Sequence, residues 1–198
     1  MANIIEIETL RLNLRQWRQE DRPAFARLNA DPMVMRYYPG VLSAKESNAM
    51  AQKMERLIHK QGWGFWAVEK RDDQRFIGFV GLNKPAYELP VTPCVEIGWR
   101  LAKEYWGCGY ASEAAKACLN VAFNRLNLSD VYSFTSLTNT KSQAVMQRLG
   151  MTNTHANFEH PMIPENHPLR EHVLYRIAKP SWLRHRSNAD IINNNDQQ

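Results

Sequence analysis

Residues 95–123 constrain the fold of this chain more than any other stretch. They read as a short apolar run typical of a β-strand, then Gly107 and Gly109, one residue apart, and then an amphipathic helix. Glycine allows a sharp turn, and the first N–H groups of a helix lack internal partners and lie at the positive end of its dipole. The order strand, glycine turn, helix therefore predicts a binding site for an anion such as pyrophosphate. Small and apolar side chains predict the inner face of this helix: Ala111, Ala115, Cys118, Leu119, Ala122 and Leu126.

Two widespread phosphate-binding motifs do not fit these residues. A nucleoside-triphosphate loop needs a Lys-Ser/Thr pair after the second glycine, where Tyr110 and Ala111 stand. The dinucleotide fingerprint needs a third glycine at the position of Ser112. A glycine turn can also be a simple tight connection, so the turn alone leaves the ligand open.

The composition is that of one globular domain. The chain has 198 residues, of which 44% are hydrophobic, and this is enough for one domain with its own core. We expect a single domain over residues 1–183 and a polar, Asn-rich tail over residues 184–198 that is predicted to be disordered. The net charge of +5 suits an anionic cofactor, or a ribosomal or nucleic-acid neighbourhood, and requires neither.

The sequence predicts a cytoplasmic protein without a metal. The first ten residues include Glu6 and Glu8 and no apolar segment of a signal peptide, and no run of 18 apolar residues predicts a membrane span. Three cysteines, Cys94, Cys108 and Cys118, have no spacing typical of a disulfide framework or a zinc site. Cys108, between the two glycines, is either an exposed thiol or a small tolerated side chain.

The remaining elements are predicted from hydrophobic periodicity and turn residues. A first strand over residues 4–17 changes phase at Glu8–Thr9, which indicates a bend or bulge. Ser43 and Glu46 form a capping-box pattern for a helix that ends at Gly62. Further strands are predicted over residues 64–70, 76–82, 96–101, 131–137, 152–158 and 169–178.

The glycine turn resembles motif A of the GNAT superfamily of acyl-CoA-dependent N-acetyltransferases. The family's loop reads Arg/Gln-x-x-Gly-x-Gly/Ala, and Gly109 and Ala111 match its last two fixed positions. Trp106 departs from the first position, and this departure resembles the RimJ/RimL-like branch of ribosomal-protein N-terminal acetyltransferases. Backbone amides would do most of the phosphate binding, so the departure puts little in doubt.

A second motif extends the resemblance. Asn139, Ser142 and the later Leu149-Gly150-Met151 are similar to motif B of the same branch. With the opening phrase at residues 8–15, the resemblance covers most of residues 5–178. It implies an α+β GNAT fold, with a mixed, mainly antiparallel, splayed sheet flanked by helices on both faces, and acetyl-CoA as cosubstrate.

The resemblance also implies how the cosubstrate is held. The turn would anchor the pyrophosphate, and the pantetheine arm would pair with backbone groups of the strand before it, where Gly98 indicates a bulge or a close backbone approach. A free N–H there could stabilise the oxyanion. The predicted cofactor-binding residues are Trp99, Arg100, Leu101, Trp106, Gly107, Cys108, Gly109, Tyr110, Ala111, Ser112 and Asn139.

Glu96 and Ser142 are the predicted catalytic residues. Glu96 lies where many GNAT members place a glutamate, so we expect it to act as general base through water; a carboxylate that ties two strands together is the alternative. The family's tyrosine acid is replaced by Met146, and the resembling branch offers Ser142 as a hydrogen-bond donor to the leaving thiolate. Helix capping is the alternative for Ser142 and for Asn139.

The acceptor side is less defined by the sequence. Tyr37, Tyr38 and Trp63 are candidates for the acceptor pocket or for packing, and the proline-rich loop 83–93 is expected to cross its mouth. Four histidines (His155, His160, His167 and His172) on a proline-interrupted segment do not form a metal-ligand pattern. We expect His160, His167 or Arg170 either to shape the acceptor end or to order the loop.

The predicted function is acetyl-CoA-dependent transfer of acetyl to a primary amine by direct attack. The first predicted acceptor is a protein N-terminal α-amine, for example of a ribosomal protein, and the second is a small-molecule amine. A non-enzymatic acyl-CoA-binding module is a third reading, against which Glu96, Asn139 and Ser142 argue. No direct nucleic-acid or membrane contact is predicted, and the oligomeric state is left open.

Overall fold

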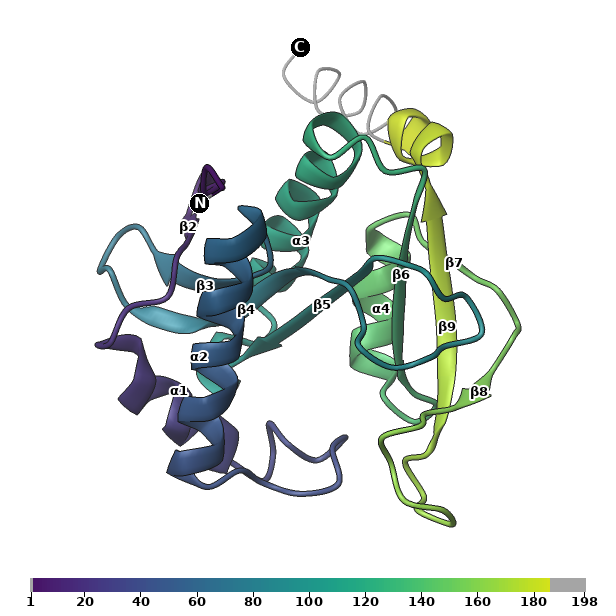
Figure 1. The fold of residues 1–198 in the computed structure, drawn as a ribbon, viewed down its shortest axis with the longest axis horizontal. Helices are drawn as coiled ribbons and strands as arrows, with labels where there is room; N and C mark the ends of the chain where they lie inside the picture. Colours follow the sequence, from purple (N-terminus) through teal and green to yellow (C-terminus); the bar gives the residue numbers. More distant parts are fainter. Residues whose placement is uncertain (1, 186–198) are drawn as a thin grey trace.

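The computed structural model describes residues 2–185, and Figure 1 shows their arrangement. The described strands form one nine-stranded sheet in the order β1-β2-β3-β4-β5-β6-β9-β7, with β8 also paired to β9. The pairing of β5 with β6 is parallel and the other described pairings are antiparallel. The strands are β1 (Ile7–Glu8), β2 (Leu12–Arg15), β3 (Phe65–Lys70), β4 (Phe76–Asn83), β5 (Glu96–Leu101), β6 (Asp130–Ser136), β7 (Thr152–Asn153), β8 (Phe158–Glu159) and β9 (Glu171–Ala178).

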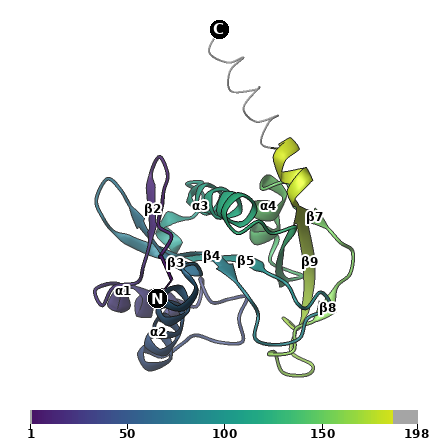
Figure 2. The ribbon, with the colours of Figure 1, turned by 45° about the horizontal axis from the view of Figure 1, so that its top comes forward.

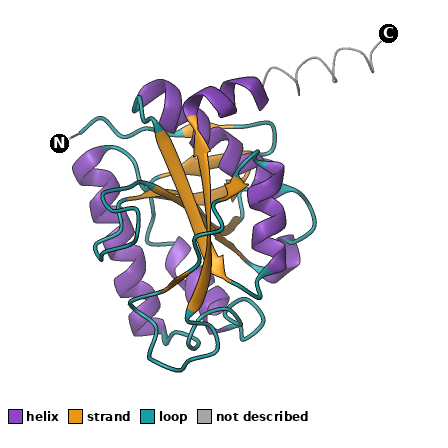
Figure 3. Cartoon of the chain, turned by 90° about the vertical axis from the view of Figure 1, so that its right-hand side faces the viewer, coloured by secondary structure: helices purple, strands orange, loops and turns teal. Residues whose placement is uncertain are grey.

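Helices cover both faces of this sheet, which confirms the predicted α+β architecture (Figures 2 and 3). α1 and α2 lie on one face, and α3 and α4 lie on the other (Figure 2). A short 3₁₀ turn (Lys103–Tyr105) precedes the glycine turn, and a π-helical turn (Val121–Arg125) prolongs α3. The helices are α1 (Asp21–Ala30), α2 (Ala44–Gln61), α3 (Tyr110–Asn120) and α4 (Thr140–Arg148).

Local sequence signals explain the ends of α2. The Ser43 hydroxyl accepts a hydrogen bond from the Glu46 N–H at 3.3 Å, and the Glu46 carboxylate accepts one from the Ser43 N–H at 2.8 Å. Gly62 ends the helix at φ 86°, a left-handed conformation that favours glycine. The predicted capping box and the predicted end of this helix are confirmed.

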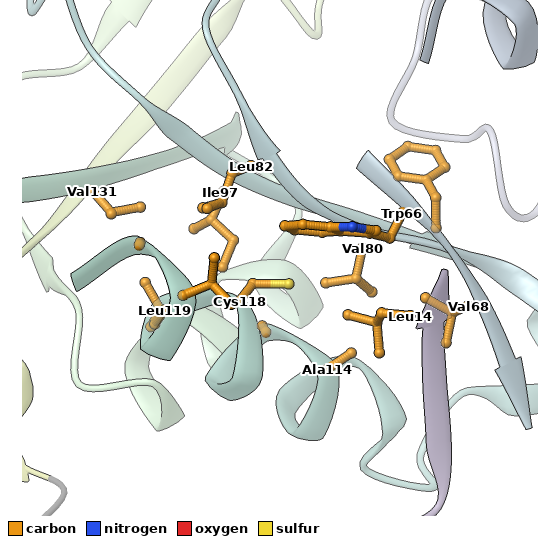
Figure 4. Packing of buried hydrophobic residues seen from close by; sticks show 14 of the residues in the cluster. Leu14, Trp66, Val68, Val80, Leu82, Ile97, Ala114, Cys118, Leu119 and Val131 are labelled. Carbon is orange, nitrogen blue, oxygen red and sulfur yellow. The ribbon is translucent and has the colours of Figure 1, made fainter. Parts of the chain in front are cut away.

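One part of the core lies between the sheet and α3 (Figure 4), and another part includes Phe25 of α1 and Ile58 of α2 on the other face. Trp66, Leu82 and Ile97 are buried against Cys118 and Leu119 of α3. Alanine at neighbouring positions of α3 lets the helix approach the sheet closely. The inner face that the sequence predicted for this helix is confirmed, because Ala115, Cys118, Leu119 and Ala122 are fully buried and Ala111 and Leu126 are half-buried.

The sheet forks between β5 and β6. β5 pairs with β4 along its whole length, from Gly78↔Leu101 to Asn83↔Glu96. Its register with β6 is one pair among the described residues, Glu96↔Tyr132, supported by a hydrogen bond from the Tyr132 N–H to the Val95 carbonyl at 3.0 Å. Beyond this point β5 leaves β6, as predicted for a splayed sheet.

Some expected elements differ from the structure. The phase change at Glu8–Thr9 is a reversal of the chain and not a bulge, because β1 pairs antiparallel with β2 through Ile7↔Leu14. The predicted strand over residues 152–158 is two short strands, β7 and β8, which pair with different parts of β9. Gly98 lies in regular pairing with Gly81, and the close approach there is to the ring of Phe65.

The predicted tail falls mostly outside the described residues. Residues 184 and 185, which the sequence assigned to it, belong to a helix that begins at residue 179. His185 lies 3.2 Å from the Arg148 carbonyl through its Nε2, so this segment packs on the end of α4. The prediction for residues 186–198 concerns a part of the chain that the structure does not describe.

Candidate active site

A cleft of about 650 Å³ lies beside the fork in the sheet. The connection between α1 and α2, the end of β5, the glycine turn and the start of α4 line it. We call it the main cleft. The predicted cofactor-binding residues that line it are Trp99, Arg100, Leu101, Trp106, Gly107, Gly109, Tyr110, Ala111, Ser112 and Asn139, together with Ser142. Cys108 is exposed and is not part of the lining, so the structure does not bring it together with the others.

The glycine turn presents an uncapped helix start to the main cleft. Gly107 and Gly109 have φ 77° and φ 80°, so both positions require the left-handed conformation. A Cβ on Gly107 would meet nothing within 4 Å, which means that backbone conformation and not space selects glycine there. No side chain of the described residues caps α3, so its first N–H groups are free to bind an anion.

Arg11, which precedes Cys108 by 97 residues, supports this turn, and it was not singled out from the sequence. Its guanidinium donates to the Cys108 carbonyl at 3.0 Å and to the Glu113 carboxylate at 2.6 Å, and it stacks on Tyr110 at 4.5 Å. The opening phrase of the sequence was the signal that could have identified it. Arg11 therefore holds the turn in place through contacts distant in sequence.

The charge of the main cleft is positive. Arg36, Arg100, Lys141 and Arg148 line it, and no carboxylate does so among the described residues. Lys141 lies over the ring of Trp106, 5.0 Å from its centroid, and the Trp106 indole N–H donates to the Leu101 carbonyl at 2.8 Å. This arrangement suits a long anionic ligand.

The fork leaves backbone groups of β5 without a strand partner. The Val95 and Ile97 carbonyls accept hydrogen bonds from β6, the second from the Ser133 hydroxyl at 2.9 Å. Because backbone groups of alternate residues point to the same side of a strand, the N–H and carbonyl of Trp99 point to the same open side. They can pair with an extended amide-bearing ligand.

Asn139 and Ser142 form a small network at the start of α4. The Asn139 side chain caps the helix by accepting from the Ser142 N–H at 3.3 Å, so Asn139 and not Ser142 performs the capping. Its amide N–H groups donate to Thr135 Oγ1 at 2.9 Å and to Ser142 Oγ at 3.0 Å. Since the Ser142 oxygen accepts a hydrogen bond, its own O–H can donate into the main cleft.

Glu96 lies on the opposite side of β5 from Trp99. Burial raises the pKa of its carboxyl from 4.5 to about 7, although the hydrogen bond from Asn83, at 2.7 Å, acts in the opposite direction. Burial, and then the charge of Glu96, also raise the pKa of the Tyr87 hydroxyl and the Cys94 thiol. Neither Asn83 nor Tyr87 was singled out from the sequence, since no motif marks them. A carboxylate with this pKa can accept and release a proton near neutral pH.

The loop between β4 and β5 crosses toward β8 and β9, as Figure 1 shows. The Tyr87 hydroxyl lies 3.1 Å from His160 Nε2, and the His160 ring lies 4.8 Å from that of His172. Burial, and then His172, lower the pKa of His160 from 6.5 to about 4. His160 therefore reaches the loop, whereas Arg170 binds Glu159 at 2.9 Å and His167 bonds the Leu169 N–H at 3.2 Å within the hairpin.

The tyrosines and tryptophan predicted near the acceptor have different positions. Tyr37 and Tyr38 line the main cleft. Trp63 is 7% exposed and packs in the core, so the packing alternative holds for it.

A second hollow, of about 760 Å³, lies beside α1. Its buried charges are already paired, because Arg15 binds both Asp21 and Glu69. No group of three or more His, Cys, Asp and Glu side chains suited to a metal occurs in residues 2–185. None of the helices described there has the length and apolar character to cross a membrane.

The fork between β5 and β6, the uncapped start of α3 and the positive charge of the main cleft together define an α+β protein suited to bind an extended anionic ligand. Residues 11–152 match the family model described as Acetyltransferase (GNAT) domain, so the chain belongs to the GNAT acetyltransferase family. The protein is accordingly an N-acetyltransferase, and its family implies the use of acetyl-CoA.

Individual relatives agree with this assignment. The chain is 30% identical over 185 residues to FsC-acetyl coenzyme A-N(2)-transacetylase of Aspergillus fumigatus, covering 90% of this chain and 78% of the relative. A GNAT-family acetyltransferase from Bacillus anthracis has a TM-score of 0.74 and 26% identity, covering 89% of this chain and 99% of that one. RimJ of Mycobacterium smegmatis in complex with CoA-disulfide has a TM-score of 0.64 and 19% identity, covering 85% of this chain and 82% of that one, which concerns the fold alone.

Proposed function

We propose that the protein transfers acetyl from acetyl-CoA to the N-terminal α-amine of a protein or peptide. The observation that supports it is the buried carboxyl of Glu96 on β5, which accepts a hydrogen bond from Asn83 at 2.7 Å and whose pKa burial raises to about 7. An α-amine has a pKa of about 7.7–8.0, against about 10.4 for lysine, so a base of this strength suffices for an α-amine. The resemblance to the RimJ/RimL-like branch supports the same acceptor.

Residues on and around β5 would bind the cosubstrate and stabilise the reacting carbonyl. Acetyl-CoA supplies the activated acetyl thioester. The free N–H groups at the start of α3, from Tyr110 to Ser112, and the cations Lys141 and Arg148 bind its phosphates. The open edge of β5 at Trp99 pairs with the pantetheine arm, and a free N–H there stabilises the oxyanion.

Glu96 would act as the general base, and Ser142 would act as the hydrogen-bond donor to the leaving group. Glu96 accepts a proton from the attacking amine through water, and the hydrogen bond from Asn83 keeps the carboxylate oriented. Ser142 donates its O–H to the leaving sulfur while its oxygen accepts from Asn139. Because both N–H groups of Asn139 are used within the protein, Asn139 contacts the pantetheine arm through a remaining lone pair of its carbonyl oxygen.

Release of the CoA thiol tests the acceptor. Purified protein is supplied with acetyl-CoA and with either short peptides of varied N-termini or small amines, including polyamines and amino acids. Turnover with peptides alone supports the proposal, and turnover with small amines alone overturns the acceptor. Unchanged turnover in both Glu96→Gln and Ser142→Ala contradicts the catalytic roles.

A small-molecule amine is the second candidate acceptor. The relative from Aspergillus fumigatus is named as a transacetylase acting at an N(2) position of FsC, and its similarity covers 90% of this chain. We further propose that residues 1–183 act as one acetyltransferase domain in either case.

A further inference from the structure

Arg100 is a buried cation without a buried anion. Its exposed fraction is 7%, and none of the ion pairs within residues 2–185 involves it. One guanidinium nitrogen donates to Asn29 Oδ1 at 2.7 Å, and Nε is buried with no hydrogen-bond partner. Buried charges in proteins are ordinarily paired, because an uncompensated one is strongly unfavourable.

The surroundings of Arg100 hold the guanidinium in place without neutralising it. The Tyr38 ring lies 4.1 Å and the Phe79 ring 5.5 Å from its central carbon. Asn29, fully buried, is itself fixed by a hydrogen bond to Ser47 at 2.9 Å. A cation on an aromatic face gains only part of the stabilisation that an opposite charge provides. The group is therefore pre-organised to bind an anion.

The guanidinium of Arg100 lies on the face of the sheet that α1 and α2 cover. The side chain contacts Asn29 of α1, Met50 of α2 and Tyr38 of their connection, whereas the glycine turn belongs to the face covered by α3. Arg100 also lines the main cleft, and Arg36 lies exposed at its edge. Since its contacts are with α1, α2 and their connection and not with the glycine turn, Arg100 is available to a ligand other than the phosphates of the cosubstrate.

Arg100 and Glu96 lie on the same face of β5, with Gly98 between them. Their Cα atoms are roughly 13 Å apart at the usual rise of a strand. Glu96 receives its hydrogen bond from Asn83 and forms no ion pair with Arg100. The two groups are therefore placed at either end of one short segment of β5, with the ring of Phe65 lying over Gly98 between them.

We propose that Arg100 binds a carboxylate of the acceptor and so places the acceptor's amine beside Glu96. The preferred acceptor is an amine that carries a carboxylate a few bonds away. This rests on the proposed function, in which the acceptor is a peptide, and the carboxylate is then an acidic side chain next to the N-terminus. The α-carboxylate of a free amino acid presents the same chemistry.

Matched acceptors separate these cases. Two peptide amides differ only in Glu or Gln after an N-terminal Ser, and two small amines are an amino acid and its amide. We expect kcat/KM of the wild type to favour the acidic member of a pair by about tenfold to a hundredfold, the range of a hydrogen-bonded charge. Arg100→Gln brings that ratio close to one through the acceptor's KM, and Arg100→Lys restores part of it.

Arg148→Gln is the matched control, because Arg148 lines the same cleft from α4. We expect it to change the KM for acetyl-CoA and to leave the acceptor ratio as in the wild type. Circular dichroism and thermal unfolding check that every variant is folded. The inference is overturned if wild-type ratios are close to one, or if Arg100→Gln raises only the KM for acetyl-CoA.

The outcomes distinguish this inference from the proposed function. If the enzyme prefers the amino acid over its amide and both peptides are inactive, the result supports the binding of a carboxylate by Arg100 and excludes a peptide as the acceptor. If both peptides turn over equally, the result supports a peptide as the acceptor and excludes the proposed binding of a carboxylate by Arg100. If nothing turns over, calorimetric titration of CoA-saturated protein with each acceptor decides, since the acidic members must bind more tightly to the wild type than to Arg100→Gln.

Discussion

Two arginines with nearly the same burial have opposite surroundings in this protein. Arg15 on β2 is 5% exposed and Arg100 on β5 is 7% exposed. Arg15 binds Asp21 through two hydrogen bonds of 2.8 Å and Glu69 through another of 2.8 Å. Arg100 has Asn29 and two aromatic faces instead.

The same contrast holds for the regions around them. Beside Arg15 every buried charge has an opposite charge, which stabilises the packing of α1 on the sheet. Around the loop between β4 and β5, Glu96 has a raised pKa and His160 a lowered one, both chiefly because of burial. Groups that the protein does not neutralise itself are available to a substrate or to a proton. The contrast thus separates buried charges that the fold pairs with each other from buried groups that it leaves without an opposite charge within residues 2–185.

Breaking the Arg15 cluster should give the largest effect. Arg15→Met leaves the buried Asp21 without its cationic partner and Glu69 with only the exposed Arg18, and we expect it to lower the free energy of unfolding by about 3–5 kcal/mol. Urea denaturation at neutral pH measures the change. Arg18→Met is the control, because the Arg18 side chain is 57% exposed although it lies 3.3 Å from Glu69, and we expect a loss below about 1 kcal/mol. Equal losses in the two variants would contradict this contrast.

Glu96→Gln tests the raised pKa of the buried carboxyl, which, unlike the carboxylates around Arg15, has no cationic partner among the described residues. The wild type gains stability from its protonated Glu96 below pH 4.5 and loses it as the pH rises through about 7. The variant should therefore be more stable by about 1–3 kcal/mol at pH 8, allowing for the partial exposure of the group, and equal to the wild type at pH 4.5. Its kcat/KM should fall by about 10²- to 10⁴-fold and lose the acidic limb near pH 7. Retention of that limb in the variant assigns it to another group.

His160→Phe tests the lowered pKa of a buried imidazole in the same way. The wild type should lose stability as the pH falls from 6.5 to about 4, because the buried imidazole must take up a proton. Between pH 7 and pH 4.5, we expect the free energy of unfolding to decrease by about 1–2 kcal/mol less in the variant than in the wild type, as measured by denaturation at the two pH values. His59→Phe, at an exposed position on α2, should keep the pH dependence of the wild type. An unchanged pH dependence in His160→Phe would show that other groups cause the loss.

Arg100→Met should give the smallest change in stability. Removal of the unpaired charge offsets the loss of the hydrogen bond to Asn29, so we expect a change within about 1 kcal/mol in either direction. Denaturation beside Arg15→Met makes the comparison direct. A loss as large as that of Arg15→Met would mean that Arg100 supports the fold.

Local signals in the sequence predicted much of the fold and part of the site. The glycine turn, the inner face of α3 and the capping box at Ser43 depend on residues close to one another in the chain, and each is confirmed. The reversal at Glu8–Thr9 was misread, because a change of phase is the same in sequence for a bulge and for a tight hairpin. Trp63 was ambiguous because an aromatic residue packs equally well in a core or in a pocket.

The sequence by itself determined the family motifs, the order of the elements and the residues that form the cleft's backbone framework. Only the tertiary structure decided which charges are paired. Arg15 meets Glu69 from a neighbouring strand, and Glu96 meets Asn83 from another, whereas no carboxylate reaches Arg100 within the described chain. The physical reason is that the energy of a charge depends on its solvent exposure and on neighbours brought together by the sheet, neither of which is a property of local sequence.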